Sequence, residues 1–592
     1  MVPGMSPMRL RVGRPLAVLL LALTLVLAGL GARALAVRTW NAVVEYRTPF
    51  AVPLPPAPGG PGPARRALLI VADGLRVDTF ASMAVRERFR ARAALGRAWA
   101  TPPTLSYPGW TAIVTGTPPE ISGVTTNWHR GPVRVDSLFA AARRAGHRTA
   151  AAGHPGWRQL FGADLDDFVA VPDPPLTDLA AIHQTTIAVA RAGERFLREG
   201  AAALVLLHFP APDLMAHGYG VRSQPYADTV RVLDEELGRL LAPVDLTTTA
   251  VLLTADHGHL DRGGHGGGEE VVRAVPLLLA GPGVAAGERF EARHVDLAPT
   301  LAALLGLPIP SHSVGRPLIE AFTAMPEGLD RRWGQQQAAI FGIYAQVALR
   351  RHAPVFTTPL GTATPEEALM AAADDLARQM AEWRERGLGR ERRSRLPGAL
   401  VLALLPLAGL LAYRPRRDLL PAVAGAAVFF IVALGLYVGR GYTFSLSVIN
   451  REELLRPFFD ARAREAALAL GAAAFAAGWA ARRRGAATGA VAGLTAAYLV
   501  AWIALLHALH FWVLWGFRFP WYLPDLGHGF RFYLSLVAMV PVGVLAPVTP
   551  AVGLVGYAAG RGLEWLRRGG APRRRAPRPD TPSPGASPGP PA

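Results

Sequence analysis

The chain has 592 residues, too many for one ordinary hydrophobic core, and 51% of them are hydrophobic. Its formal net charge is +18, and every basic residue other than histidine is arginine. A basic chain can indicate nucleic-acid binding, but these arginines cluster beside apolar stretches and in the C-terminal tail, as expected for a membrane protein. The absence of cysteine excludes disulfides and thiolate metal sites. The composition therefore predicts membrane lipids as partners, with no nucleic acid.

The N-terminal region predicts a membrane anchor. Three arginines precede the apolar run Pro15–Ala36, which at roughly 20 residues is long enough to cross a bilayer. A cleaved signal peptide is the alternative, but the length of the run and the later apolar stretches favour a retained anchor over residues 1–37. Residues 38–66 include a Pro- and Gly-rich segment and are predicted to be a linker.

Strand-like apolar runs alternate with helical stretches after Ala67, which predicts an α/β domain with a mostly parallel sheet over residues 67–322. Ligands of such sheets bind beyond the carboxyl ends of the strands, so a site is expected at that edge. The predicted strands are Ala67–Ala72, Arg148–Ala152, Ala203–His208, Ala250–Thr254 and Val275–Ala280. The predicted helices are Val135–Ala145, Leu176–Arg198, Tyr226–Leu241 and Asp296–Leu305.

The fourth predicted strand is followed by residues suited to metal binding. Asp256 and His257 come directly after it, and His265 follows on a glycine-rich loop. Carboxylate and imidazole together suit a divalent transition metal, most often zinc. The glycines would let the loop fold back, so that His265 could reach a metal near Asp256 and His257. The alternative for a single Asp-His-Gly triplet is an ordinary turn after a strand.

Other strand ends carry matching residues. Asp73 follows the first predicted strand, while Asp213 and His217 follow the third and are close enough in sequence to ligate one metal. Between them Ser106 is expected just before a helix opened by Pro108, where backbone N–H groups favour an anion. A metal-bound hydroxyl there would be a usable nucleophile. The alternative role for this serine is simple helix capping.

Five segments follow one another in the order found in the alkaline phosphatase superfamily. They are Val71–Arg76, Pro103–Gly109, Asp213–His217, Asp256–Gly258 and Gly264–Gly266. The chain resembles in particular the type I phosphodiesterase/nucleotide pyrophosphatase branch, and within it the glycosylphosphatidylinositol ethanolamine-phosphate transferases. Those proteins also join such a domain to several membrane helices. The resemblance covers about Ala67 to Leu318.

This resemblance implies two divalent metal ions, expected to be zinc. One would be held by Asp73, Asp256 and His257 together with the nucleophile Ser106. The other would be held by Asp213, His217 and His265.

The resemblance also concerns residues beside the metals. In that branch an asparagine at the position of Asn127 often hydrogen-bonds a phosphoryl oxygen, and an amide donor there would stabilise the charge that develops on this oxygen during the reaction. The alternative is that Asn127 is an ordinary loop asparagine. Four further histidines near the motifs are expected to be polar neighbours rather than ligands: His129, His154, His208 and His259. Sulfatases of the superfamily carry an arginine where this chain has Trp110, which disfavours sulfate ester hydrolysis.

The C-terminal half is predicted to return to the membrane. A connector, residues 323–395, should contain a helix that begins at Thr364 with a capping box, ends near Arg386 and lies on the catalytic domain. A membrane domain, residues 396–560, follows, and residues 561–592 are expected to be disordered. Its five apolar stretches are Pro397–Tyr413, Leu419–Val438, Ala466–Ala480, Ala487–Gly516 and Phe532–Ala559.

Together with the anchor these stretches make six predicted spans. An even number of spans places the two ends of the chain on the same side of the membrane. Arginines follow the first and third stretches and fill the tail, so both termini are expected in the cytoplasm and the α/β domain outside.

The leading functional hypothesis is a membrane-embedded, two-metal phosphodiesterase or phosphoryl-transfer enzyme. Ser106 would attack an extracytoplasmic phosphodiester, with a lipid-linked substrate as a candidate, and give a covalent phosphoserine. Water would complete a hydrolase reaction, whereas a lipid or glycan hydroxyl would make the chain a phosphoethanolamine-type transferase. A further alternative is a non-catalytic membrane protein with an inactive head, which the intact set of ligand residues disfavours.

Overall fold

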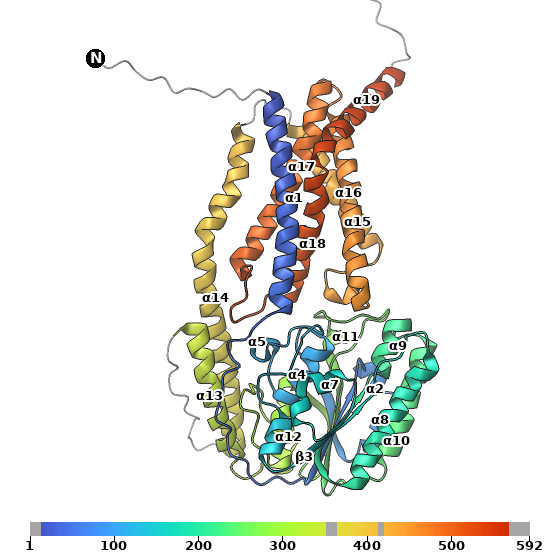
Figure 1. Cartoon of the computed structure of the whole chain (residues 1–592), viewed down its shortest axis with the longest axis vertical. Coiled ribbons are helices and arrows are strands. Elements are labelled where there is room, and N and C mark those ends of the chain that lie inside the picture. Colours follow the sequence, from blue (N-terminus) through green and yellow to red (C-terminus); the bar gives the residue numbers. More distant parts are fainter. Residues whose placement is uncertain (1–13, 351–363, 413–418, 568–592) are drawn as a thin grey trace, which may run out of the picture.

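The computed structural model describes residues 14–350, 364–412 and 419–567. An α/β domain lies at one end of the molecule and a bundle of long helices at the other, as Figure 1 shows. Helix α1 (Arg14–Val44) runs along the bundle towards the α/β domain, and the later helices return to the bundle. The beginning of α1 and the end of α19 (Thr549–Arg567) both lie at the end of the bundle far from the sheet.

The α/β domain is built on one eight-stranded sheet with the order β4-β3-β5-β1-β6-β7-β2-β8. Neighbouring strands are parallel except where β7 pairs with β6 and β2. The fold class predicted from the sequence is therefore confirmed. The strands are β1 (Arg66–Ala72), β2 (Ala93–Trp99), β3 (Arg148–Gly153), β4 (Asp167–Ala170), β5 (Ala202–Phe209), β6 (Thr249–Thr254), β7 (Ala274–Ala280) and β8 (Gly287–Arg293).

All five predicted strands are present, but three strands escaped prediction. β4 and β8 lie at the two edges of the sheet, and β2 pairs with the edge strand β8. β4 is only partly buried and β2 includes Gly96 and Arg97, so neither has the uniform apolar run that marks a strand buried on both faces. The central strands β1 and β6 do have that run and are almost completely buried.

The four predicted helices are present within a few residues of their predicted bounds, and shorter helices that were not predicted lie between them. Side-chain caps explain where three of them begin: Ser137 accepts from Ala140 N–H, Asp178 from Ala181 N–H, and Ser223 from Tyr226 N–H. The helices are α2 (Val77–Phe80), α3 (Ala84–Phe89), α4 (Ser106–Thr115), α5 (Pro119–Ser122), α6 (Leu138–Arg144), α7 (Gly156–Phe161), α8 (Leu179–Glu199), α9 (Ala211–Tyr219), α10 (Gln224–Leu241), α11 (Glu270–Arg273) and α12 (His294–Leu305).

The helix predicted to connect the two halves is longer than expected. Its capping box is present, because Thr364 N–H donates to Glu367 and Glu367 N–H donates back to Thr364. The predicted end near Arg386 is wrong, since α14 (Pro365–Ala412) continues into the apolar stretch that follows. Arginine and glutamate are good helix formers, so the charged stretch between the two parts does not interrupt the helix. Its first half packs against α13 (Leu329–Leu349).

Five more helices complete the bundle, and they pack closely against one another. They are α15 (Leu419–Gly439), α16 (Leu455–Ala480), α17 (Ala486–Trp515), α18 (Leu526–Val544) and α19 (Thr549–Arg567). The last predicted apolar stretch is therefore two helices, α18 and α19, which meet at a bend of 46°. Part of the predicted disordered tail, residues 561–567, is helical, and the remainder lies outside the described residues.

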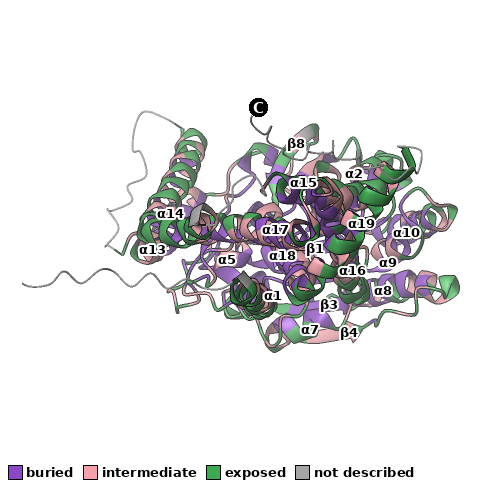
Figure 2. Cartoon of the chain, turned by 90° about the horizontal axis from the view of Figure 1, so that it is seen from above, coloured by how far each residue is buried: buried purple, intermediate pink, exposed green. Residues whose placement is uncertain are grey.

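Within the described residues, four helices are long and apolar enough to cross a membrane, or five if the bent pair is one span. The four are α1, α14, α15 and α17, so the chain is a multi-pass membrane protein. The prediction of six spans exceeds this count because α16 does not qualify, and its first half carries charged residues. Large apolar side chains are exposed along α1, α14 and α15, and Figure 2 shows α1 largely in the green of exposed residues.

Candidate two-metal site and cavity

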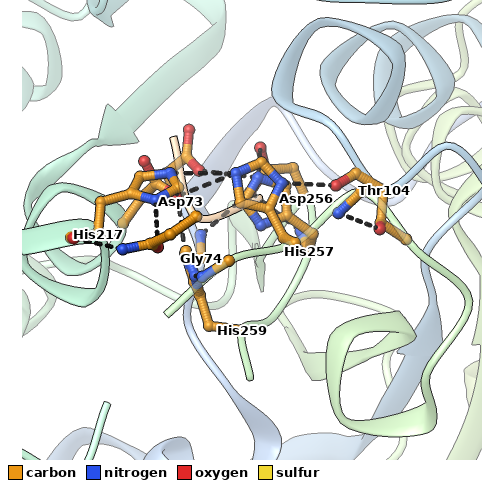
Figure 3. A network of polar contacts seen from close by, with 12 residues as sticks. Asp73, Gly74, Thr104, His217, Asp256, His257 and His259 are labelled. Atoms are coloured by element: carbon orange, nitrogen blue, oxygen red, sulfur yellow. Dashed lines mark hydrogen bonds and ion pairs between the residues drawn. The ribbon is translucent and has the colours of Figure 1, made fainter. Parts of the chain in front are cut away.

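The predicted ligands converge because three neighbouring strands end at the same edge of the sheet. Asp73 follows β1, and Asp256 with His257 follows β6. β5 leads into α9, which carries Asp213 and His217. Figure 3 shows side chains from these segments pointing towards one another. The parallel pairing of β5, β1 and β6 therefore brings together residues more than 100 positions apart in the sequence.

The first group consists of Asp73, Asp256 and His257, which are all buried. His257 Nε2 lies 3.4 Å from Asp73 Oδ1 and 3.5 Å from Asp256 Oδ2. These three atoms have no hydrogen-bond partner. Buried polar atoms are normally paired, so three unpaired atoms that face one another are suited to share a bound cation.

The remaining atoms of the two carboxylates are held in place. Asp256 Oδ1 accepts from the backbone N–H groups of Gly74 and His257. Asp73 Oδ2 lies 2.9 Å from Nε2 of His208, whose Nδ1 accepts from the backbone N–H of His154. Because Nδ1 of His208 is an acceptor, the proton of this neutral imidazole is on Nε2 and is donated to Asp73. Each carboxylate thus keeps one oxygen free for the centre of the group.

The second group consists of Asp213, His217 and His265. His217 Nε2 lies 3.4 Å from Asp213 Oδ1 and 3.2 Å from His265 Nε2. His265 Nδ1 donates to the carbonyl oxygen of Thr104 at 2.7 Å, and His217 Nδ1 donates to Oδ1 of Asn450 at 3.1 Å. Both imidazoles therefore present an unprotonated Nε2 to the group, the arrangement found in metal-binding histidines.

The glycine-rich loop returns as the sequence predicted. The imidazole of His265 stacks on that of His257, with ring centroids 3.7 Å apart. Gly264 and Gly266 both have positive φ angles, which other residues rarely adopt.

His259 lies among the ligands and was predicted to be a polar neighbour. Its Nε2 is 2.8 Å from Asp213 Oδ1, and its Nδ1 accepts from Gly264 N–H. The proton is therefore on Nε2 and is donated to Asp213. His259 also lies within 4.8 Å of the possible ligand atoms of His257 and His265, so it could join them only by giving up this hydrogen bond.

The electrostatics of the first group favour a cation. Burial, together with the neighbouring Asp256 and Asp213, raises the pKa of Asp73 well above its usual range. Burial raises the pKa of Asp256 to about 7, with Asp213 contributing, and burial lowers the pKa of His257 to about 4. The imidazole is thus neutral at neutral pH while the carboxylates repel one another. A bound dication would relieve that repulsion.

The distances fit divalent metals. Two ligands at 2.0–2.1 Å from a tetrahedral ion lie about 3.3 Å apart, close to the 3.2–3.7 Å separations that link the atoms of each group. Mixed carboxylate and imidazole ligands suit zinc and related divalent ions. The two Asp/His groups can therefore each hold a divalent metal ion.

Ser106 and Asn127 line the same cavity as these groups. Ser106 is the first residue of α4, one position further into the helix than predicted, because Leu105 is the N-cap. The carbonyl oxygen of the Asn127 side chain accepts from Tyr107 N–H at 3.0 Å. Its NH₂ group is therefore the end left for a substrate oxygen, and Glu452 of the bundle currently hydrogen-bonds to this side chain.

The cavity has a volume of about 810 Å³ and lies where the α/β domain meets the bundle. Asp73, Asp213, His217 and His265 line its polar end. Both halves build its apolar wall. Trp110, Trp128 and Leu176 belong to the α/β domain, and the bundle contributes Trp40 of α1, Phe511 of α17, and Phe530, Phe532 and Tyr533 of α18. A substrate could therefore reach the metal groups with one end while its other end contacts membrane helices.

The sequence did not reveal the contribution of the bundle to this site. Asn450, Glu452 and Ser447 all lie in the short segment between α15 and α16. Asn450 bonds to a candidate ligand 233 positions away. A single polar residue between two apolar helices carries no sequence signal for such a partner.

The domain thus combines a mostly parallel eight-stranded sheet with Asp and His residues beyond the carboxyl ends of neighbouring strands. The family model described as type I phosphodiesterase / nucleotide pyrophosphatase matches residues 67–266. The resemblance predicted from the five motifs is thereby confirmed for this domain.

Relatives with a matching sequence are GPI ethanolamine phosphate transferases. The chain is 27% identical over 351 residues to GPI ethanolamine phosphate transferase 1 of Emericella nidulans. The matched stretch covers 48% of this chain and 37% of that protein. It is 26% identical over 330 residues to the Mus musculus protein of the same name, covering 46% and 34%. The chain thus spans about a third of the length of these relatives. Among solved structures, murine ectonucleotide pyrophosphatase / phosphodiesterase 5 overlaps 44% of this chain and 100% of its own, with 14% identity and a TM-score of 0.34.

Proposed function

We propose that the chain is a metal-dependent phosphoryl-transfer enzyme of the membrane, with Ser106 as nucleophile. The observation that carries the proposal is the set of three buried, unpaired ligand atoms on Asp73, Asp256 and His257. Beside them a serine opens a helix and lines the same cavity. Two divalent ions, expected to be zinc from the chemistry of their Asp and His ligands, would stabilise charge on the entering and leaving oxygens.

The residues of the chain have separate tasks in this reaction. Ser106 Oγ would attack phosphorus in line and expel one alcohol of the diester, which leaves with the serine proton; the phosphoryl group, still esterified to its other alcohol, would then be bonded to Ser106. Asn127, with its oxygen fixed by Tyr107 N–H, would donate its NH₂ group to a phosphoryl oxygen. An acceptor hydroxyl would then take the phosphoryl group from Ser106 and regenerate the serine.

The substrate proposed is a lipid-linked phosphodiester, and the group transferred is of the phosphoethanolamine type. Support comes from the cavity, to whose apolar wall α1, α17 and α18 contribute, and from relatives named GPI ethanolamine phosphate transferase. Trp40 packs against Trp128 and Tyr533 in the wall of this cavity. Tryptophan and tyrosine side chains of membrane proteins favour the level of the lipid headgroups. The α/β domain would then lie outside the cytoplasm, with both termini inside.

A transfer assay separates the candidate activities. The purified full-length protein is incubated with a phosphoethanolamine lipid, with and without a lipid-linked glycan acceptor, and the released diacylglycerol is measured. Release that depends on the acceptor supports a transferase. Release without any acceptor indicates a hydrolase, and no release in the presence of bound metal indicates an inactive head.

A further inference from the structure

The segment between α15 and α16, residues 440–454, forms a loop that we call the bundle loop. It packs against residues 261–269, which carry the ligand His265. The Ser447 hydroxyl accepts from Gly267 N–H at 2.9 Å and donates to Glu269 at 2.8 Å. A β-carbon on Gly264 would lie 2.3 Å from the carbonyl oxygen of Ser447, so only glycine allows this approach. The membrane half is thus in close contact with the metal groups.

Asn450 of the bundle loop holds His217 at two points. Its Nδ2 donates to the carbonyl oxygen of His217 at 2.8 Å, and its Oδ1 lies 3.1 Å from His217 Nδ1. A carbonyl oxygen can only accept, so the NH₂ group of Asn450 must face it and the amide oxygen must face the ring. The ring therefore carries its proton on Nδ1 and presents Nε2 to Asp213 and His265.

The other candidate ligands are supported from within the α/β domain. Thr104 orients His265, His208 orients Asp73, and His259 orients Asp213. Among the hydrogen bonds described for the six predicted Asp and His ligands, the one between His217 and Asn450 comes from the membrane bundle. The orientation of His217 therefore depends on the position of the bundle loop.

We infer that Asn450 is a positioning residue which fixes the tautomer and orientation of His217, so that the membrane bundle completes the second metal site. This inference rests on the proposed function only in taking the second group to hold a metal. Loss of a residue that orients a metal-binding histidine typically weakens metal affinity by about 10- to 100-fold. A shift of α15 or α16 that moved the bundle loop would weaken the second metal in the same way.

The test compares metal binding by full-length protein in detergent. Zinc affinities are measured by competition with a chromophoric chelator, and cobalt substitution reports the coordination of each ion by its absorption spectrum. Asn450→Ala should weaken one of two metals by about 10- to 100-fold and change the cobalt spectrum of that site alone. Asn450→Asp keeps an acceptor for His217 Nδ1 but loses the donor to the His217 carbonyl oxygen, so it should recover part of the affinity that Asn450→Ala loses. Ser447→Ala, in the same loop but touching no ligand, is the matched control and should keep both metals.

Three results would overturn the inference. In the first, Asn450→Ala binds both metals normally. In the second, Asn450→Asp loses as much metal affinity as Asn450→Ala. In the third, Ser447→Ala loses as much metal affinity as Asn450→Ala. The last two would assign the effect to docking of the loop. If Asn450→Ala does not fold, Asn450→Ser, which is too short to reach the ring, takes its place. A wild-type protein that binds fewer than two metals contradicts the proposed function instead, whatever Asn450 does.

Discussion

Replacing His208 by phenylalanine tests how the first metal group is held. The His208 ring is 1% exposed, packs edge-on against Trp110 with ring centroids 4.6 Å apart, and donates to Asp73 Oδ2 at 2.9 Å. His208→Phe keeps an aromatic ring in this place and removes the donor. A hydrogen bond to a charged group contributes about 1.5–3 kcal/mol. We therefore expect zinc affinity at the first group to fall by about 10- to 100-fold, equivalent to about 1.4–2.8 kcal/mol.

The assay is competition between the full-length protein and a chromophoric chelator for zinc. His208→Gln retains a side-chain donor and should recover part of the affinity. His147→Phe, at an exposed position just after α6, is the control for adding a phenylalanine and should bind zinc normally. Unchanged binding of both metals by folded His208→Phe would refute the reasoning, and so would weakening of the second metal rather than the first.

Four further outcomes are expected. Ser106→Ala should abolish turnover and keep both metals, because the Asp and His ligands remain; normal hydrolysis of a chromogenic diester would exclude it as nucleophile. Zinc binding should release more protons at pH 6 than at pH 8, measured by calorimetry in two buffers, because Asp256 has a pKa of about 7 and holds its proton only below that pH; equal release contradicts this. Reporter fusions at Pro58 and Gly585 should lie on opposite sides of the membrane, and a shared side would refute the predicted topology. Diesters should be favoured over monoesters by at least about tenfold in kcat/KM, and equal constants would point to Arg451, the arginine among the described cavity residues.

The sequence was sufficient to predict which residues converge, because strand ends are visible in it. Asp73 and Asp256 each follow an apolar run that forms a central strand, and parallel strands end at one edge of a sheet. The loop glycines likewise indicated that His265 could fold back to His257, and the two rings stack. Short-range patterns of this kind depend only on strand periodicity and backbone freedom.

Contacts between the two halves could not be predicted in this way. Asn450 reaches His217, and Glu120 of the α/β domain pairs with Arg384 of α14 and accepts from Leu523 N–H. These contacts join segments hundreds of residues apart and depend on how the bundle seats on the domain. The sequence also suggested a break near Arg386, where charge replaces the apolar pattern, yet the helix continues because its backbone hydrogen bonds need no apolar face.

Metal content of the purified full-length protein tests the central claim most directly. After extraction in detergent and dialysis against zinc-free buffer, we expect elemental analysis to find about two divalent ions per chain, as the two Asp/His groups require. Asp256→Ala, which removes a ligand of the first group alone, should retain about one. A wild-type chain that retains no metal and binds none when zinc is returned would contradict the account.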